Sequence, residues 1–114
     1  MDRLVRAFPL LEGKRDAFRA FTHEMSRRRA EADVFYRSFG IVRESWHLQE
    51  TAGGELIICC TDIEDVRTGS AYAASQGQFE TWFKGRVLDI CGIDPNIQPL
   101  GPECRTVFEW PASS

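Results

Sequence analysis

One of the two histidines in the chain lies in a segment whose polar residues recur at every second position. His47 is preceded by Arg43 and Ser45 and followed by Gln49. Because residues two apart in a strand share a face, these four side chains would line one surface. Imidazole titrates near neutral pH and can accept or release a proton. We therefore predict His47 as a catalytic acid or base with Arg43 beside it, and Ser45 and Gln49 as substrate-orienting groups.

Other candidate binding residues come from outside this strand. Arg6 follows the alternation of a short first strand and could supply positive charge to an anionic oxygen. Two residues are expected across a hairpin from His47, and one aromatic residue belongs to a later helix. These further substrate-binding candidates are Ile58, Cys60 and Trp82.

His47 has three other interpretations. It could be a cavity or dimer-interface histidine that only hydrogen-bonds a neighbour. It could lower the pKa of the Cys60 thiol and so create a nucleophile, if the two are cross-strand neighbours. A lone imidazole could also be an axial haem ligand. The sequence leaves these alternatives open.

The cysteines do not have metal-site spacing. Zinc sites use close pairs of Cys or His, whereas Cys59 and Cys60 are adjacent and Cys91 and Cys104 are isolated. Adjacent strand residues point to opposite faces, so Cys59 and Cys60 cannot readily bind one ion. We predict no metal and no cofactor, and interpret the four cysteines as small buried apolar residues.

The segment around His47 has the pattern of a β-hairpin. Two β-type runs, 41–50 and 55–61, flank Thr51-Ala52-Gly53-Gly54, where glycine tolerates the positive φ of tight turns. One face then carries Trp46, Leu48, Ile57 and Cys59, which we place under helices. The face of His47 is mixed and left open. Leu4, Arg6 and Phe8 are equally mixed, so we assign them to the open face as well.

The remaining segments complete a ferredoxin-like order. A strand at 4–8 precedes a helical stripe at 14–39, which is either one helix or two pieces bending near Arg28 within a solvated arginine triplet. Further expected elements are a helix at 66–74 started by Asp62, a helix from Ser75 that Gly92 ends and that leaves Lys84 outside its apolar stripe, and a strand at 104–110. The order βαββαβ predicts four antiparallel strands with helices on one face. We expect one α+β domain over 1–110 and a flexible tail over 111–114.

Composition excludes several classes of protein. The net charge of −3 and pI near 5.4 argue against nucleic-acid binding. The first residues lack the apolar run of a signal peptide, and no segment has the roughly 18 apolar residues that cross a bilayer. We therefore expect a cytoplasmic protein with no membrane partner, whose cysteines are reduced.

Three stretches resemble a known superfamily. The segments LVRAFPL (4–10), GIVRESWHLQ (40–49) and SQGQFETWFK (75–84), together with the element order, resemble those of an uncharacterised bacterial family within the dimeric α/β barrel superfamily. The resemblance implies a homodimer in which two ferredoxin-like subunits pack sheet against sheet and bind small molecules. Members of the superfamily include cofactor-free monooxygenases, cyclases and isomerases, and haem-degrading enzymes. Fold alone does not choose among these.

From the residues and the resemblance together we expect a homodimer that binds a small aromatic or carbonyl-bearing molecule. If it is an enzyme, we expect monooxygenase-like or cyclase and isomerase chemistry at His47. The alternative is a non-catalytic binding or interaction module whose open face is only a dimer interface, or a haem-binding protein.

Overall fold

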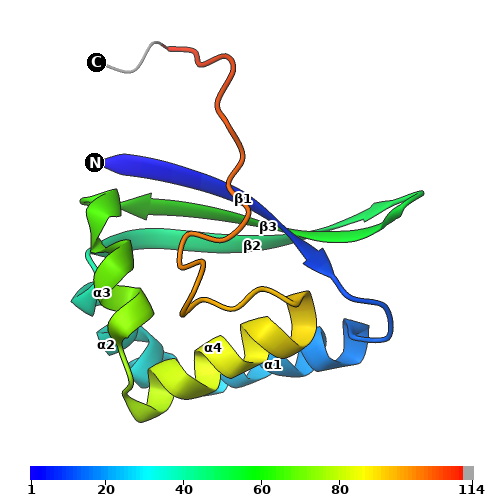
Figure 1. Cartoon of the computed structure of the whole chain (residues 1–114), viewed down its shortest axis with the longest axis horizontal. Helices are drawn as coiled ribbons and strands as arrows, with labels where there is room; N and C mark the ends of the chain where they lie inside the picture. The colour runs from blue at the N-terminus through cyan, green and yellow to red at the C-terminus, as the bar shows by residue number, and fades with distance from the viewer. Residues whose placement is uncertain (112–114) are drawn as a thin grey trace.

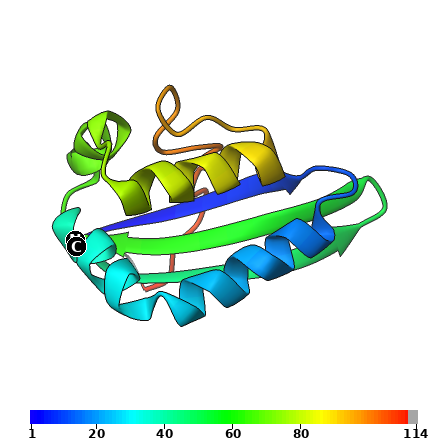
Figure 2. The same ribbon diagram turned by 90° about the horizontal axis from the view of Figure 1, so that it is seen from below.

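The computed structural model describes residues 1–111 and shows a three-stranded antiparallel sheet with every helix on one face (Figures 1 and 2). The strand order is β1-β3-β2. In chain order the elements are β1 (Asp2–Leu10), α1 (Arg15–Arg27), α2 (Arg29–Ser38), β2 (Ile41–Thr51), β3 (Gly54–Ile63), the short 3₁₀ helix η1 (Val66–Thr68), α3 (Gly69–Ala74) and α4 (Gln78–Cys91). The α+β class is confirmed, but the four-stranded βαββαβ order is wrong.

The predicted last strand, 104–110, does not form. The chain touches β1 at a single bridge, Arg6 to Glu103, with hydrogen bonds from Ala7 N to Pro102 O (3.1 Å) and from Cys104 N to Val5 O (2.7 Å). Continuing that register would set Arg105 opposite Leu4, on the apolar side where the helices lie. Burying an unpaired guanidinium is costly, which is a physical reason for the chain to leave the sheet there.

Gly101 makes the approach to β1 possible. Its φ is +66°, a conformation that side-chain-bearing residues rarely adopt. A Cβ atom at this position would lie 2.7 Å from the Phe8 ring. Glycine is therefore required where the chain turns onto the sheet edge.

The first helical stripe is two helices. α1 ends at Arg27 and α2 begins at Arg29, so the bend lies at Arg28, as one of the two alternatives proposed. Arg28 is not a solvated member of the triplet: its guanidinium lies over Trp82, 4.5 Å from the ring centroid, and over Phe79 at 5.0 Å. Such cation–π contacts attract the charge to the ring faces.

The helix predicted at 66–74 is present as η1 followed by α3, but the residues that cap the later helices are not those predicted. β3 continues to Ile63, so Asp62 is a strand residue, and Asp65 caps η1 by accepting from Arg67 N (2.9 Å). Gly77, not Ser75, precedes α4, while Gly92 ends it with φ +72° as predicted. Which residue caps a helix depends on where the preceding element ends, and the local sequence does not specify that end.

Lys84 is buried, although its place outside the helical stripe predicted exposure. Its ammonium donates to Ala73 O (3.1 Å), Ser75 O (2.7 Å) and Asn96 Oδ1 (2.9 Å). Burial lowers the pKa of this amine. Lys84 thereby ties the end of α3 to the loop after α4.

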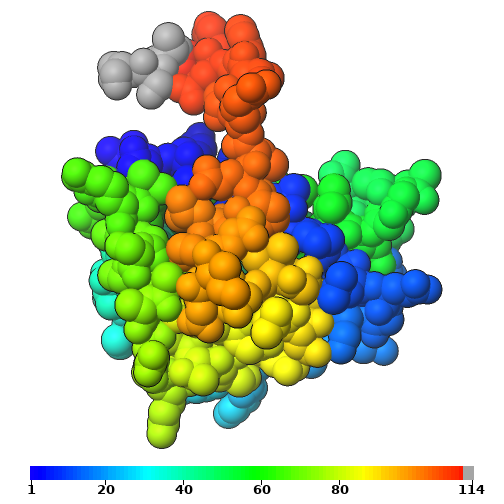
Figure 3. Space-filling view, in the orientation of Figure 1, coloured from blue at the N-terminus to red at the C-terminus, as the bar shows by residue number. Residues whose placement is uncertain are grey.

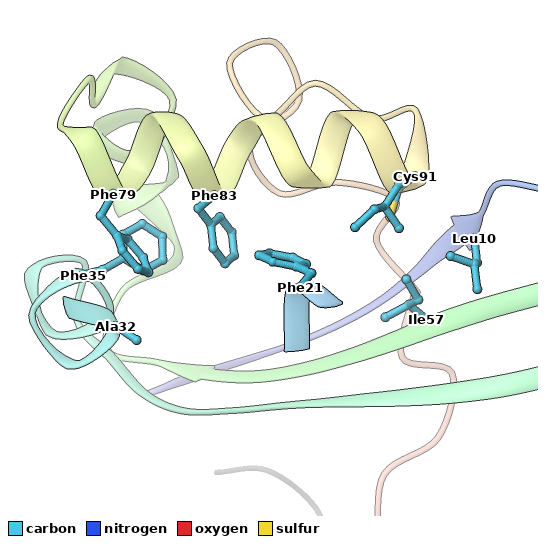
Figure 4. Packing of buried hydrophobic residues seen from close by; sticks show 9 residues of the cluster. Leu10, Phe21, Ala32, Phe35, Ile57, Phe79, Phe83 and Cys91 are labelled. Atoms are coloured by element: carbon cyan, nitrogen blue, oxygen red, sulfur yellow. The ribbon is translucent and has the colours of Figure 1, made fainter. Parts of the chain in front are cut away.

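The hairpin and its two faces are confirmed. β2 and β3 are joined through Ala52 and Gly53, with Trp46 paired to Cys59 and His47 to Ile58. Trp46, Ile57 and Cys59 face the helices; Leu48 shares their alternation but remains exposed. The core between the layers is rich in phenylalanine, with Phe21, Phe35, Phe79 and Phe83 lying between α4 and the sheet (Figure 4).

None of the helices in residues 1–111 has the length and apolar character needed to cross a membrane. The predicted tail falls mostly on 112–114, outside the described residues.

Candidate functional site

A cavity of about 110 Å³ lies between the sheet and the helices. Its walls are mainly aromatic and aliphatic, because α1, α2 and α4 turn their apolar stripes toward the alternating apolar residues of the strands. Aromatic side chains on these walls include Phe18, Phe21, Phe35, Tyr36, Trp46 and Tyr72. The polar groups are concentrated around Arg6 and Glu44.

Glu44 is the centre of a buried hydrogen-bond network. Its Oε1 accepts from Arg6 Nη2 (3.2 Å) and Thr61 Oγ1 (2.7 Å), and its Oε2 accepts from Tyr36 OH (2.7 Å) and Trp46 Nε1 (2.9 Å). The Glu44 side chain is only 7% exposed. Four donors, one of them charged, replace the water that this carboxylate loses, as burial of a charge requires.

Arg6 is not fully satisfied by this network. The side chain is 13% exposed, and Nη2 also donates to Thr61 Oγ1 (2.9 Å) and contacts Cys59 Sγ (3.1 Å). Within residues 1–111 its Nε–H is buried and has no hydrogen-bond partner. An unpaired buried donor costs about 1–3 kcal/mol, so this nitrogen would gain from a ligand oxygen placed beside it.

The tyrosine hydroxyls and the cysteine thiol near Glu44 are held in their neutral forms. Burial, reinforced by the Glu44 charge, raises the pKa of the Tyr36 phenol well above its usual range, and burial does the same at Tyr72. Burial and Glu44 also raise the pKa of the Cys59 thiol to about 12. These groups stay protonated near neutral pH, so Tyr36 remains a donor and Cys59 is a poor nucleophile.

Five of the predicted site residues share by alternation the face of the sheet away from the helices: Ser45, His47, Gln49, Ile58 and Cys60. Arg43 has the same alternation, but it also lines a groove at the edge of β2. Ser45 Oγ is 3.0 Å from His47 Nε2. Cys60 pairs directly with Ser45, whereas His47 pairs with Ile58, so Cys60 is only diagonal to the imidazole. His47 lines neither the cavity nor the surface groove described below.

Arg6 does not join this group. It pairs with Cys59 on β3 and therefore points toward the helices. The assignment of Leu4, Arg6 and Phe8 to the His47 face was wrong, because it treated a charged residue as a sign of an open face. All three line the cavity under the helices. A guanidinium can lie inside when a carboxylate and other acceptors accompany it.

Trp82 lies neither in the cavity nor on the sheet face of His47. Its ring packs edge-on against Phe21, with centroids 5.4 Å apart, and contacts Phe79 at 5.5 Å. Arg28 covers its other side. The prediction of a binding role for Trp82 is therefore not supported by any contact with the cavity, and its contacts are those of a residue joining α4 to the α1–α2 bend.

All four cysteines are free, and Cys104 is exposed rather than buried as predicted. Burial raises the pKa of Cys91 to about 12. Among residues 1–111, no three His, Cys, Asp or Glu side chains gather in a way that could hold a metal ion.

Sequence reasoning missed Glu44, Tyr36 and Thr61. A signal for Glu44 was available, because alternation sets it on the same face as Trp46. A carboxylate on a face expected to lie under helices must have buried donors. Tyr36 carried no such signal, since its spacing is also that of an ordinary core residue.

In comparisons with known proteins, no family model, no curated protein and no solved structure matches the chain.

Proposed function

We propose that this protein binds a small, largely apolar molecule carrying a carbonyl oxygen in the cavity between the sheet and the helices. The observation that carries the proposal is Arg6, which lines an aromatic cavity and whose buried Nε–H has no partner within residues 1–111. Ligand sites typically combine apolar walls with a few placed polar groups.

The size of the cavity restricts the ligand. Its volume of about 110 Å³ is smaller than the roughly 300–1,000 Å³ of sites for drug-sized ligands. One ring or a short chain would fill it.

The charges favour a neutral acceptor. Glu44 already lies 3.2 Å from Arg6 Nη2 and neutralises it. A ligand carboxylate would place a second negative charge beside Glu44, which like-charge repulsion disfavours. A carbonyl oxygen can accept from Nε–H without this cost.

Binding can be tested with two carbonyl probes, cyclohexanone and acetophenone, by protein-detected NMR titration. We expect Arg6→Met to weaken their binding about 10- to 100-fold, because a hydrogen bond from a charged group contributes about 1.5–3 kcal/mol. Arg3→Met is the matched control, since Arg3 is a solvent-exposed arginine of the same strand. Equal affinities in the two variants would contradict the proposal.

The open sheet face supports the homodimer as a second part of the proposal. Apolar side chains on this face include Val5, Ala7, Ile58 and Cys60. Their neighbours bury them only in part, and no described helix covers them. Two sheets packing face to face would bury these apolar side chains together with the polar ones around His47.

The contact between Ser45 and His47 favours a second candidate function, proton transfer at carbon on the open face. Ser45 can orient the imidazole, and pairing of two copies would enclose both groups. If so, the protein should accelerate deuterium exchange next to the carbonyl of cyclohexanone in D₂O, followed by NMR. We expect His47→Ala to abolish the acceleration, whereas His23→Ala, on exposed α1, should retain it. A folded His47→Ala variant with undiminished exchange would rule out this function, and a change only in dimer affinity would favour the interaction module.

A further inference from the structure

The end of the described chain forms an arm that leaves the body of the protein. After Cys104 donates to Val5 O, residues 105–111, here called the C-terminal arm, extend away from β1 on the side opposite the helices (Figures 1 and 3). Only the base of the arm is held by the sheet.

The C-terminal arm is unusually apolar for an exposed segment. Val107 is 82% exposed, and Phe108 and Trp110 are each 83% exposed. Aromatic side chains bury about 150–250 Å² each and dominate interface energies. Three large apolar residues within four positions, two of them aromatic and all exposed to water, indicate a segment that binds a protein surface.

A groove of about 560 Å³ lies at the opposite edge of the sheet, between α1, α2 and β2. We name it the β2-edge groove. Its apolar lining includes Met25, Ala32, Trp46 and Val42, and Val42 is 58% exposed. In the described chain β2 has β3 as its only strand neighbour, so its outer edge is open to an extended segment.

The β2-edge groove is lined by charges of both signs, with Asp33 and Glu44 as its acidic residues. Arg29 and Arg43 line the β2-edge groove, and neither forms an ion pair within residues 1–111. Glu109 lies between Phe108 and Trp110 in the C-terminal arm. Because neighbouring residues of an extended segment point to opposite sides, Glu109 would face away from the groove when the two aromatic rings enter it. The contact would therefore rest on the aromatic rings rather than on charge.

The reach of the C-terminal arm agrees with a paired arrangement. In a dimer whose open faces meet about a two-fold axis parallel to the strands, β1 of one copy lies opposite β2 of its partner. The two sheets would be about 10 Å apart, a distance that three extended residues span at about 3.3 Å each. Residues 105–107 would cross this gap, and Phe108 to Trp110 would arrive at the partner's β2 edge.

We infer that the C-terminal arm of one copy binds in the β2-edge groove of a second copy of this chain. The inference rests on the proposed pairing of the open faces and adds the segment that holds them. A two-fold axis makes the exchange reciprocal, so each dimer contains two such contacts. The arm's own groove is at the far edge of its own sheet, and the arm points away from that sheet (Figure 1).

Disulfide trapping tests the inference. In a Cys104→Ser background, one protein carries Val42→Cys and another carries Phe108→Cys; the two are mixed and mildly oxidised. We expect a covalent heterodimer whose peptide map joins positions 42 and 108. The variant with both changes on one chain should then also form linked dimers. Linkage within single chains only, or no link between these positions, would overturn the inference.

Equilibrium sedimentation gives an independent measure. We expect Phe108→Ala with Trp110→Ala to weaken the dimer at least about tenfold, as the loss of aromatic anchors does. Thr106→Ala, a substitution in the crossing part of the arm, should leave the affinity unchanged. A dimer unaffected by the double change would overturn the role of the arm while leaving the pairing of the sheets intact. A wild-type monomer would overturn both, and neither result depends on cavity binding.

Discussion

Replacing Glu44 by alanine is expected to lower the free energy of unfolding by about 3–5 kcal/mol. The change removes the acceptor of four hydrogen bonds and leaves Arg6, whose side chain is 13% exposed, without its counter-charge. Breaking a buried pair from one side costs more than the pair contributes, because the remaining charge stays desolvated. Urea denaturation followed by circular dichroism gives the difference.

The chain offers a matched control for this prediction. Asp62 also pairs with an arginine of β1, Arg3, at 2.9 Å, but that arginine side chain is 73% exposed. Asp62→Ala should cost about 1 kcal/mol or less, as exposed ion pairs do. Combining Glu44→Ala with Arg6→Met should cost less than the sum of the single changes, because the uncompensated charge is gone. A Glu44→Ala variant no less stable than Asp62→Ala would show that the network is solvated in solution.

Local patterns were sufficient to predict the hairpin. Alternating residues on either side of Ala52 and Gly53 define both the turn and the two faces, and the face of Trp46 and Cys59 lies under the helices as predicted. The same holds for Gly92, where a left-handed cap ends α4. Each of these features depends on residues close together in the sequence.

Local pattern could not show that the last predicted strand, 104–110, is absent. Its residues are β-type, and only the register against β1 disfavours a strand there. From the bridge between Arg6 and Glu103, the next inward position along the chain is Arg105. The cost of placing that arginine beside the cavity depends on which strand it meets and which face is covered. Neither fact is present in residues 104–110 themselves.

Arg6 was assigned to the wrong face for a related reason. Arg6 and Glu44 are 38 residues apart, and each alone indicates a solvent-facing position. Only their juxtaposition across β3, with Thr61 between them on the middle strand, makes both acceptable inside. Ser45, His47, Gln49, Ile58 and Cys60 share one face as predicted, because they belong to one hairpin.

Phe35→Ala is expected to cost about 3–5 kcal/mol, the usual range for truncating a fully buried phenylalanine. Phe35 is 3% exposed, and its ring centroid lies 4.9–5.8 Å from those of Tyr36, Phe39, Tyr72, Phe79 and Phe83. The neighbouring Val34→Ala is the control: Val34 is 72% exposed, so its truncation should change stability by about 0.5 kcal/mol or less.

Because Phe35 also lines the cavity, its truncation should enlarge a space that already exists. An apolar cavity of this kind stays dry and accepts small aromatic molecules. Benzene should therefore restore part of the lost stability by binding the native state, and should raise the melting temperature of Phe35→Ala more than that of Val34→Ala. Equal shifts in the two variants would mean that the helices collapse into the vacated space, and the aromatic layer would then be deformable rather than a rigid wall for a ligand.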